Sequence, residues 1–175
     1  MNRSVEDWVV VRPRTSADIA QASSALVAVH NADGYPVEGV DDPEAWLSPP
    51  GLLGAWVAEA EDRVVGHVAV SRAAGEGAVA LWTDRSGASE DAVCVLARLF
   101  VLSQVRKRAV GEHLVRAAEK YANDHRLRLV LDVMRKDTSA IRLYRRLGWL
   151  EIGTVAHRFG EGRQQEALAF VSPES

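Results

Sequence analysis

The sequence has almost no cysteine, no long apolar run and no excess of positive charge, and each shortage excludes a class of protein. A single cysteine, Cys94, excludes an internal disulfide framework and any zinc site built from several cysteines. No apolar run is long enough to span a bilayer and residues 1–10 carry no secretory signal core, so we expect a cytoplasmic protein. The net charge of −3 provides no global positive field that would gather nucleic acid.

The remaining composition is that of an ordinary globular protein. Hydrophobic residues make up 47% of the 175 residues and charged residues 26%. A chain of this length buries roughly 70% of its unfolded surface, so we expect one domain over residues 1–175. The five histidines show no metal-ligand spacing, and we therefore expect no metal.

Hydrophobic periodicity and turn residues predict the order of the elements. Helices are expected at residues 15–31, 43–47, 107–124 and 137–148. Strands are expected at residues 7–13, 55–60, 64–72, 79–82, 92–102, 127–134, 149–159 and 163–171. Strands and helices alternate from residue 92 onward, which predicts a mixed α/β sheet with at least one parallel pair joined by a right-handed crossover.

A basic cluster lies where the strand at 92–102 passes into the following helix. Residues 103–114 read "SQVRKRAVGEHL", with Arg106, Lys107 and Arg108 in succession. The first turn of a helix carries backbone N–H groups without partners and a partial positive charge, so cations there are unfavourable unless an anion binds. Glu112 after the single Gly111 excludes a Walker motif and a dinucleotide fingerprint. Solvated surface and nucleic-acid contact are the alternatives for the cluster alone.

Two short motifs follow one another in this half of the chain. Residues 106–111 read "RKRAVG", and residues 137–149 read "DTSAIRLYRRLGW". This pair resembles the two signatures of the GNAT acyl-CoA N-acetyltransferases, Arg/Gln-x-x-Gly-x-Gly/Ala and Asn-x-x-Ala-x-x-Leu-Tyr-x-x-x-Gly-Phe. Three positions depart from the family pattern: Ala109 stands for glycine, Asp137 for asparagine and Trp149 for phenylalanine.

The resemblance implies both a fold and an activity. The fold is α/β, a mixed and mainly antiparallel twisted sheet of six to seven strands flanked by about four helices. Its central parallel strands are splayed around coenzyme A. The activity is transfer of an acetyl group from acetyl-CoA, as cosubstrate, to a primary amine by direct attack in a ternary complex.

The resemblance also implies roles for individual residues. The strand end "LFV" would pair with the pantetheine arm, the amides of residues 107–112 would hold the diphosphate, and Tyr144 would protonate the leaving thiolate. The implied cofactor-binding residues are Leu99, Phe100, Val101, Arg106, Lys107, Arg108, Ala109, Val110, Gly111, Glu112, Asp137 and Tyr144.

The general base is less clearly indicated. Many family members place a glutamate on the strand before the phosphate loop, where this chain offers only Arg98. Some N-terminal acetyltransferases use an acid five residues before the motif asparagine, which here is Asp132. Water is the alternative base. Asp137 can accept a hydrogen bond as asparagine does, but it cannot donate one.

Each of these side chains also has a purely structural interpretation. Tyr144 could be a core aromatic, and Asp132 a satisfied polar group in a strand. Cys94 is expected to be a buried, inert thiol. His157, near the end of a predicted strand, could face the acceptor, but we expect it to be an exposed residue at a strand end.

The acceptor cannot be named from the sequence. The loop at residues 31–48 has no lysine or arginine and carries acidic residues that would attract a cationic amine, with Tyr35 and Trp46 for apolar or cation–π contact. The acids are Asp33, Glu38, Asp41, Asp42 and Glu44.

We expect a small-molecule or peptide amine as partner, without nucleic acid or membrane, and a homodimer stays open. A non-catalytic acyl-CoA-binding regulatory module is the alternative function.

Overall fold

The computed structural model describes residues 9–159 and 162–174, without the side chains of residues 107, 108 and 157–159. The described chain divides into two compact units. The first comprises the residues up to Val70 together with Ala97–Ala118, and the second comprises Ser71–Leu96 with the residues from Glu119 onward. The expectation of one domain over residues 1–175 stays a prediction.

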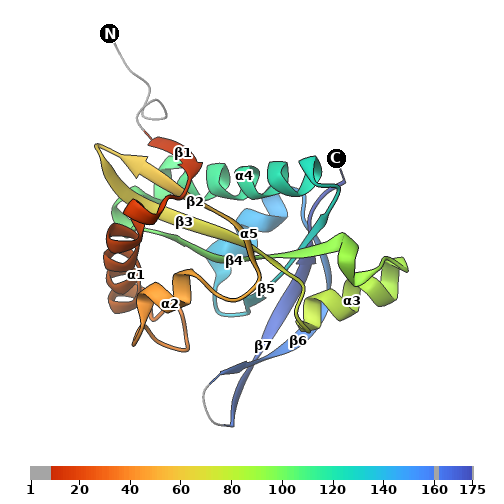
Figure 1. Ribbon diagram of the computed structural model, residues 1–175. Helices are drawn as coiled ribbons and strands as arrows, with labels where there is room; N and C mark the ends of the chain where they lie inside the picture. Colours follow the sequence, from red (N-terminus) through yellow and green to blue (C-terminus); the bar gives the residue numbers. More distant parts are fainter. Residues whose placement is uncertain (1–8, 160–161, 175) are drawn as a thin grey trace. The chain divides into compact units, whose positions relative to one another are not determined.

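The described residues form seven strands in one sheet, in the order β1-β2-β3-β4-β5-β7-β6 (Figure 1). The pairs β1/β2, β5/β7 and β6/β7 are antiparallel, whereas β4 and β5 are parallel, with Val93–Val95 opposite Arg128–Val130. The predicted parallel pair is therefore confirmed. The strands are β1 Val9–Pro13, β2 Leu52–Ala60, β3 Arg63–Arg72, β4 Val93–Val101, β5 Arg128–Met134, β6 Leu150–Phe159 and β7 Arg163–Val171.

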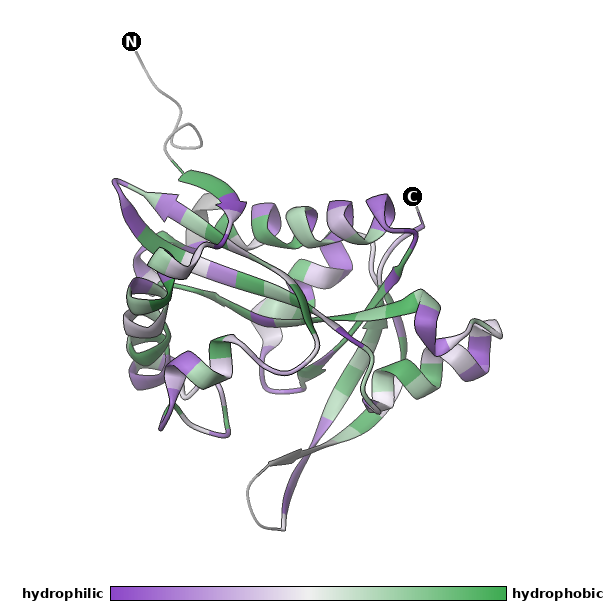
Figure 2. Ribbon diagram, in the orientation of Figure 1, coloured by the Kyte–Doolittle hydropathy of each residue, from purple (hydrophilic) through white to green (hydrophobic). Residues whose placement is uncertain are grey.

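Five α-helices accompany these strands in the described chain. They are α1 Ile19–Asp33, α2 Pro43–Leu47, α3 Gly77–Ser86, α4 Val110–Asp124 and α5 Thr138–Arg146. Green and purple residues alternate along α4 in Figure 2, as expected of an amphipathic helix. The predicted elements agree with the observed ones in type and order except at residues 79–82, with ends that differ by up to four residues. Residues 7 and 8 of the first predicted strand lie outside the described chain.

The short strand expected at residues 79–82 is wrong, because these residues belong to helix α3. A short apolar run does not distinguish strand from helix by periodicity alone. Tertiary contacts in the structure favour the helix. Gly77 lies against Val155, where an added Cβ would come within 2.8 Å of the valine side chain, and Gly87 ends the helix with φ +74.

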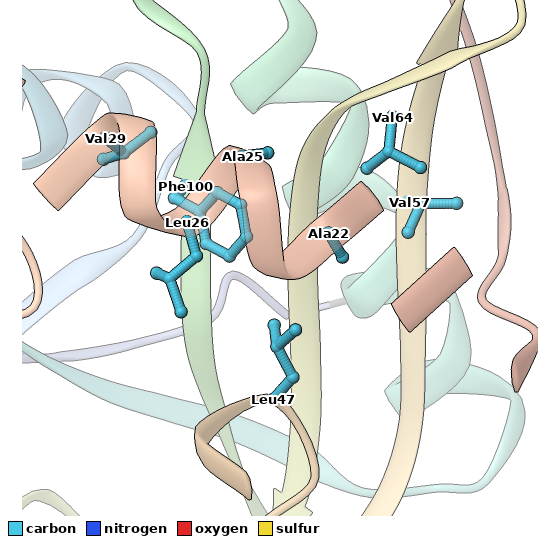
Figure 3. Close-up of a cluster of buried hydrophobic side chains, with 8 residues drawn as sticks. All are labelled: Ala22, Ala25, Leu26, Val29, Leu47, Val57, Val64 and Phe100. Atoms are coloured by element: carbon cyan, nitrogen blue, oxygen red, sulfur yellow. The ribbon is translucent and has the colours of Figure 1, made fainter. Parts of the chain in front are cut away.

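The core of the first unit joins α1 and α2 to the strands (Figure 3). Leu26 of α1, Leu47 of α2 and Val57 of β2 are fully buried, and Phe100 of β4 packs into the same cluster. The start of α1 is stabilised by Asp18, which accepts from the amide of Thr15 and from two nitrogens of Arg12 at 2.8 Å. This core positions the end of β4.

In the second unit, β7 lies between β5 and β6, and β6 and β7 form a long hairpin (Figure 1). Tyr144 of α5 packs against Phe170 of β7 and against Trp149, with ring centroids 6.0 and 5.5 Å away. Trp149 also donates from Nε1 to Oε1 of Glu119 at 2.8 Å in a buried position. The chain reverses after α5 at Gly148, which has φ +87.

Candidate active site

The end of β4 contains a backbone irregularity at the predicted pantetheine edge. Arg98 has φ +58, a left-handed conformation that is rare for a residue with a side chain inside a strand. Phe100 is buried, while Leu99 and Val101 are half-buried. The amide of Leu102 donates to the carbonyl of Val65 in β3 at 2.9 Å. The predicted residues Leu99, Phe100 and Val101 thus form the last part of β4 in the first unit.

The chain passes from β4 into α4 through a 3-10 turn at Ser103–Arg108 and a single left-handed residue, Ala109. The φ of Ala109 is +59 and its ψ is +20. Helix α4 then begins at Val110, so the amides of Val110 and Gly111 have no acceptor within the helix. The methyl group of alanine has therefore not prevented the left-handed turn before the helix, although the helix begins three residues later than predicted.

The motif arginine Arg106 is engaged by neighbouring residues of the first unit. Its Nε donates to the carbonyl of Val101 at 3.1 Å, and its Nη2 forms an ion pair with Asp33 at the end of α1. These contacts connect the turn to β4 and to α1. The side chains of Lys107 and Arg108 lie outside the described structure, so their predicted contribution to phosphate binding stays a prediction.

Tyr144 is the predicted acid, and the structure places it in α5 with 4% of its surface exposed. Burial raises the pKa of the phenol above its ordinary value, and the charge of Asp137 raises it further. The hydroxyl makes no hydrogen bond within the part of the chain that the structure describes. The phenol is thus fully protonated at neutral pH and keeps its donor for a ligand.

Asp137 and Asp132 also lie in the second unit. Asp137 caps α5 through its carbonyl, which accepts from the amide of Ile141 at 3.1 Å, and its carboxylate influences Tyr144 electrostatically. Asp132 lies opposite Ala169 of β7 and is exposed, although its neighbours Leu131 and Val133 are buried. The structure therefore brings Asp137 and Tyr144 together, while Asp132 holds an accessible carboxylate on an otherwise buried strand.

Two sequence candidates remain, Cys94 and His157. Cys94 is fully buried, its Sγ donates to the carbonyl of Arg128 at 3.7 Å, and burial raises its pKa to about 12. The expectation of an inert thiol is confirmed. The side chain of His157 lies outside the described residues.

A buried network beside the β4 irregularity was not found from the sequence. Nδ1 of His67 lies 2.9 Å from the carbonyl oxygen of Arg98, and Nε2 lies 3.0 Å from Nη1 of Arg14. The imidazole stacks on Phe100, and the guanidinium of Arg98 lies 4.8 Å from the ring centroid of Trp46. A histidine inside the apolar run "VVGHVAV" was the available signal, but its partners depend on the strand arrangement.

The predicted acceptor loop packs on this network. Nε1 of Trp46 donates to Oε1 of Glu38 at 2.8 Å, and Tyr35 meets the indole edge-on at 5.9 Å between centroids. The sequence suggested Tyr35 and Trp46 for apolar or cation–π contact with the acceptor. In the structure Trp46 contacts the guanidinium of Arg98.

The sequence model of the Acetyltransferase (GNAT) family matches residues 21–149. This chain belongs to the GNAT acetyltransferase family. The resemblance inferred from the two motifs is thereby confirmed, as is the expectation of an enzyme that uses acetyl-CoA as cosubstrate. No curated protein sequence matches this chain.

Solved structures of other GNAT proteins share the fold. Ribosomal-protein-alanine N-acetyltransferase from Brucella melitensis is 23% identical, with a TM-score of 0.71 and coverage of 93% of this chain and 98% of that chain. NAA60 from Arabidopsis thaliana with a bisubstrate analogue is 19% identical, with a TM-score of 0.71 and coverage of 93% and 96%. YncA from Salmonella typhimurium, with its cofactor acetyl-CoA, is 14% identical, with a TM-score of 0.68 and coverage of 93% and 92%. The predicted α/β fold is confirmed.

The residues before and within the first turn of α4 fit the diphosphate of the cosubstrate. Left-handed Ala109 and the amides of Val110 and Gly111 provide a helix N-terminus after the 3-10 turn that follows β4, which is an anion-binding arrangement. No cluster of three or more metal-ligating residues occurs among the side chains that the structure describes. No helix in the described chain is long and apolar enough to cross a membrane.

Proposed function

We propose that this GNAT protein transfers the acetyl group of acetyl-CoA to a primary amine by direct attack in a ternary complex. When bound, acetyl-CoA supplies an acetyl group activated as a thioester. The first-turn amides of α4 would hold the diphosphate, and the backbone of Val101 would hold the pantetheine arm. Arg106, which is tied to Val101 and Asp33, would keep the turn in place.

The observation that carries the proposal is the state of Tyr144. Its pKa is raised by burial, and its hydroxyl has no hydrogen-bond acceptor among the described residues. A protonated phenol that has kept its donor suits protonation of a departing thiolate. Because a raised pKa weakens the acid, donation to the thiolate would depend on the sulfur also being removed from water, which raises the thiol pKa in the same direction.

The attacking amine must lose a proton, and Asp132 or a water molecule would accept it. The exposed carboxylate of Asp132 on a buried strand supports this assignment. The acceptor would be a small-molecule or peptide amine. The name of the Brucella relative, an N-acetyltransferase of ribosomal-protein alanine, supports a peptide amine as one possibility for this chain.

The test is a thiol-release assay with acetyl-CoA across a panel of small amines, amino acids and peptide N-termini, together with calorimetry of acetyl-CoA binding. We expect binding, and thiol release with at least one class of amine. Binding without release for every amine would replace the enzyme by the regulatory acyl-CoA module. Absence of binding would contradict the proposal as a whole.

A further inference from the structure

We propose that Arg98, supported by Arg14, binds a carboxylate of the acceptor, so that the acceptor is an amino acid or a similar molecule with a carboxylate beside its amine. This inference rests on the proposed function and specifies its substrate class. The site would lie in the first unit, formed by the left-handed turn of β4 and the end of α2.

The first observation is that two half-buried arginines lack a carboxylate partner. Within the described chain, neither Arg14 nor Arg98 has an aspartate or glutamate oxygen within salt-bridge distance. Charged groups removed from water are ordinarily paired. Burial lowers the pKa of Arg14, and the charge of Asp18, which is itself paired with Arg12, opposes this shift only in part. Other arginines of the chain do form ion pairs, among them Arg12, Arg106, Arg128, Arg135 and Arg145.

The second observation is the geometry of the Arg98 guanidinium. Its Nε donates to the carbonyl of Trp46 at 3.0 Å, and its central carbon lies 4.8 Å from the centroid of the Trp46 ring. Nη1 and Nη2 make no hydrogen bond to any residue that the structure describes. These two nitrogens form the planar fork that matches both oxygens of a carboxylate. One side of the guanidinium is thus fixed by protein, and the fork is available to a ligand.

The third observation is that the residues packed around Arg98 fix its position without contributing a negative charge. His67 contacts the backbone of Arg98 through Nδ1 and accepts from Arg14 through Nε2, which requires a neutral imidazole. His67 therefore joins two cations and contributes no negative charge. Arg14 also donates to the carbonyl of Leu47 at 2.7 Å and to the hydroxyl of Ser48 at 3.0 Å. The result is two fixed positive charges beside the acidic loop at residues 31–48, a combination that suits a zwitterion.

Two other roles for Arg98 lead to different results. The two arginines could serve only to cap α2, because they bind the carbonyls of Trp46 and Leu47. That role accounts for the hydrogen bond from Nε of Arg98 but not for Nη1 and Nη2. Alternatively, the fork could stabilise negative charge that develops on the acetyl group during transfer. Removal of Arg98 would then slow the reaction equally for every acceptor.

The experiment compares kcat/KM for the common L-amino acids and for their carboxamides, in the wild type and in Arg98→Gln. Amino acids and their amides differ in amine basicity, so the informative quantity is the acid-to-amide ratio in the wild type divided by that ratio in the variant. We expect this quotient to be about 10 to 100, as for loss of a charged bidentate hydrogen bond. Arg98→Lys, which keeps the charge without the fork, should give an intermediate quotient.

Arg63→Gln is the matched control, because it removes the same charge at an exposed position at the start of β3. Its quotient should be close to one. A quotient close to one for Arg98→Gln, with or without a uniform loss of rate or a lower unfolding temperature, would overturn the carboxylate site and leave the proposed function intact. A wild type that binds acetyl-CoA and acetylates no amine of any class would overturn both proposals.

Discussion

Nδ1 of His67, a fully buried side chain, lies 2.9 Å from the carbonyl oxygen of Arg98, the left-handed residue of β4. The opposite ring nitrogen accepts from Arg14 at 3.0 Å. The tautomer is therefore determined by its partners, with the proton on Nδ1. The imidazole stabilises a strand conformation that would otherwise be unfavourable for arginine.

This relationship predicts a pH dependence of stability. Burial lowers the pKa of His67 from 6.5 to about 4. The charges of Arg14 and Arg98 lower it as well, whereas the hydrogen bond to the Arg98 backbone raises it. Below about pH 6.5 His67 binds a proton in the unfolded chain but stays neutral in the folded chain. The free energy of unfolding therefore falls as the pH is lowered, until about pH 4. The shift corresponds to roughly 3 kcal/mol across this window.

Urea unfolding of the wild type and of His67→Gln between pH 7 and pH 4 measures this effect. The variant should be less stable at pH 7, and the difference between the two proteins should shrink as the pH falls. Asp18, whose pKa is lowered by Arg12, loses its stabilising charge at lower pH in both proteins and cancels in the comparison. A difference that is independent of pH would contradict a neutral His67 in the folded state.

A second prediction concerns Ala109 in the turn before α4. Its φ of +59 is unfavourable for alanine and costs no strain for glycine. Ala109→Gly should raise the free energy of unfolding by about 0.5–1 kcal/mol, because relief of strain exceeds the added entropy of the unfolded chain. Affinity for acetyl-CoA should stay the same or increase, as measured by calorimetry. The control Ala109→Val should destabilise, and a glycine variant less stable than the wild type would contradict the argument.

A third prediction concerns Trp149, which stands where the family motif has phenylalanine. Its Nε1 donates to buried Glu119 at 2.8 Å. Trp149→Phe removes this donor and should lower the free energy of unfolding by about 1–3 kcal/mol in urea titrations. Trp82→Phe is the control, because the Trp82 indole nitrogen donates to no residue of the described chain. Equal effects of the two variants would show that the Trp149 hydrogen bond contributes nothing measurable.

A fourth prediction follows from the hydroxyl of Tyr144. Tyr144→Phe keeps the ring that packs against Trp149 and Phe170 and removes only the oxygen. Turnover should fall by about 100-fold or more, as for loss of a general acid. Acetyl-CoA affinity and the free energy of unfolding should remain close to those of the wild type. An unchanged kcat would remove Tyr144 from the acid role.

The fold was predictable from sequence where local signals are strong. Helix α2 begins at the predicted residue because Asp42 accepts from the amide of Ala45 and Pro43 occupies the first turn. Helix α3 was not predictable in the same way. Its short apolar run is compatible with either structure, and its contact between Gly77 and Val155 joins residues far apart in the chain.

The residues of the candidate site also differ in how far the sequence could predict them. The residues carried by motifs, such as Tyr144 and Ala109, could be named in advance because their spacing is local. The role of Arg98 could not, because its partners His67 and Trp46 come from β3 and α2 and meet it only through tertiary packing. The sequence indicated only that Arg98 stands where many relatives have a glutamate.

The burial of Cys94 has a practical consequence for every assay described above. The chain has one thiol, and in the folded protein it is inaccessible and has a pKa of about 12. A thiolate-specific chromogenic reagent should therefore report the coenzyme A released by turnover with almost no background from the enzyme. Colour that develops without substrate would then come from the Cys94 thiol of unfolded molecules. The same assay therefore also measures the fraction of enzyme that is unfolded.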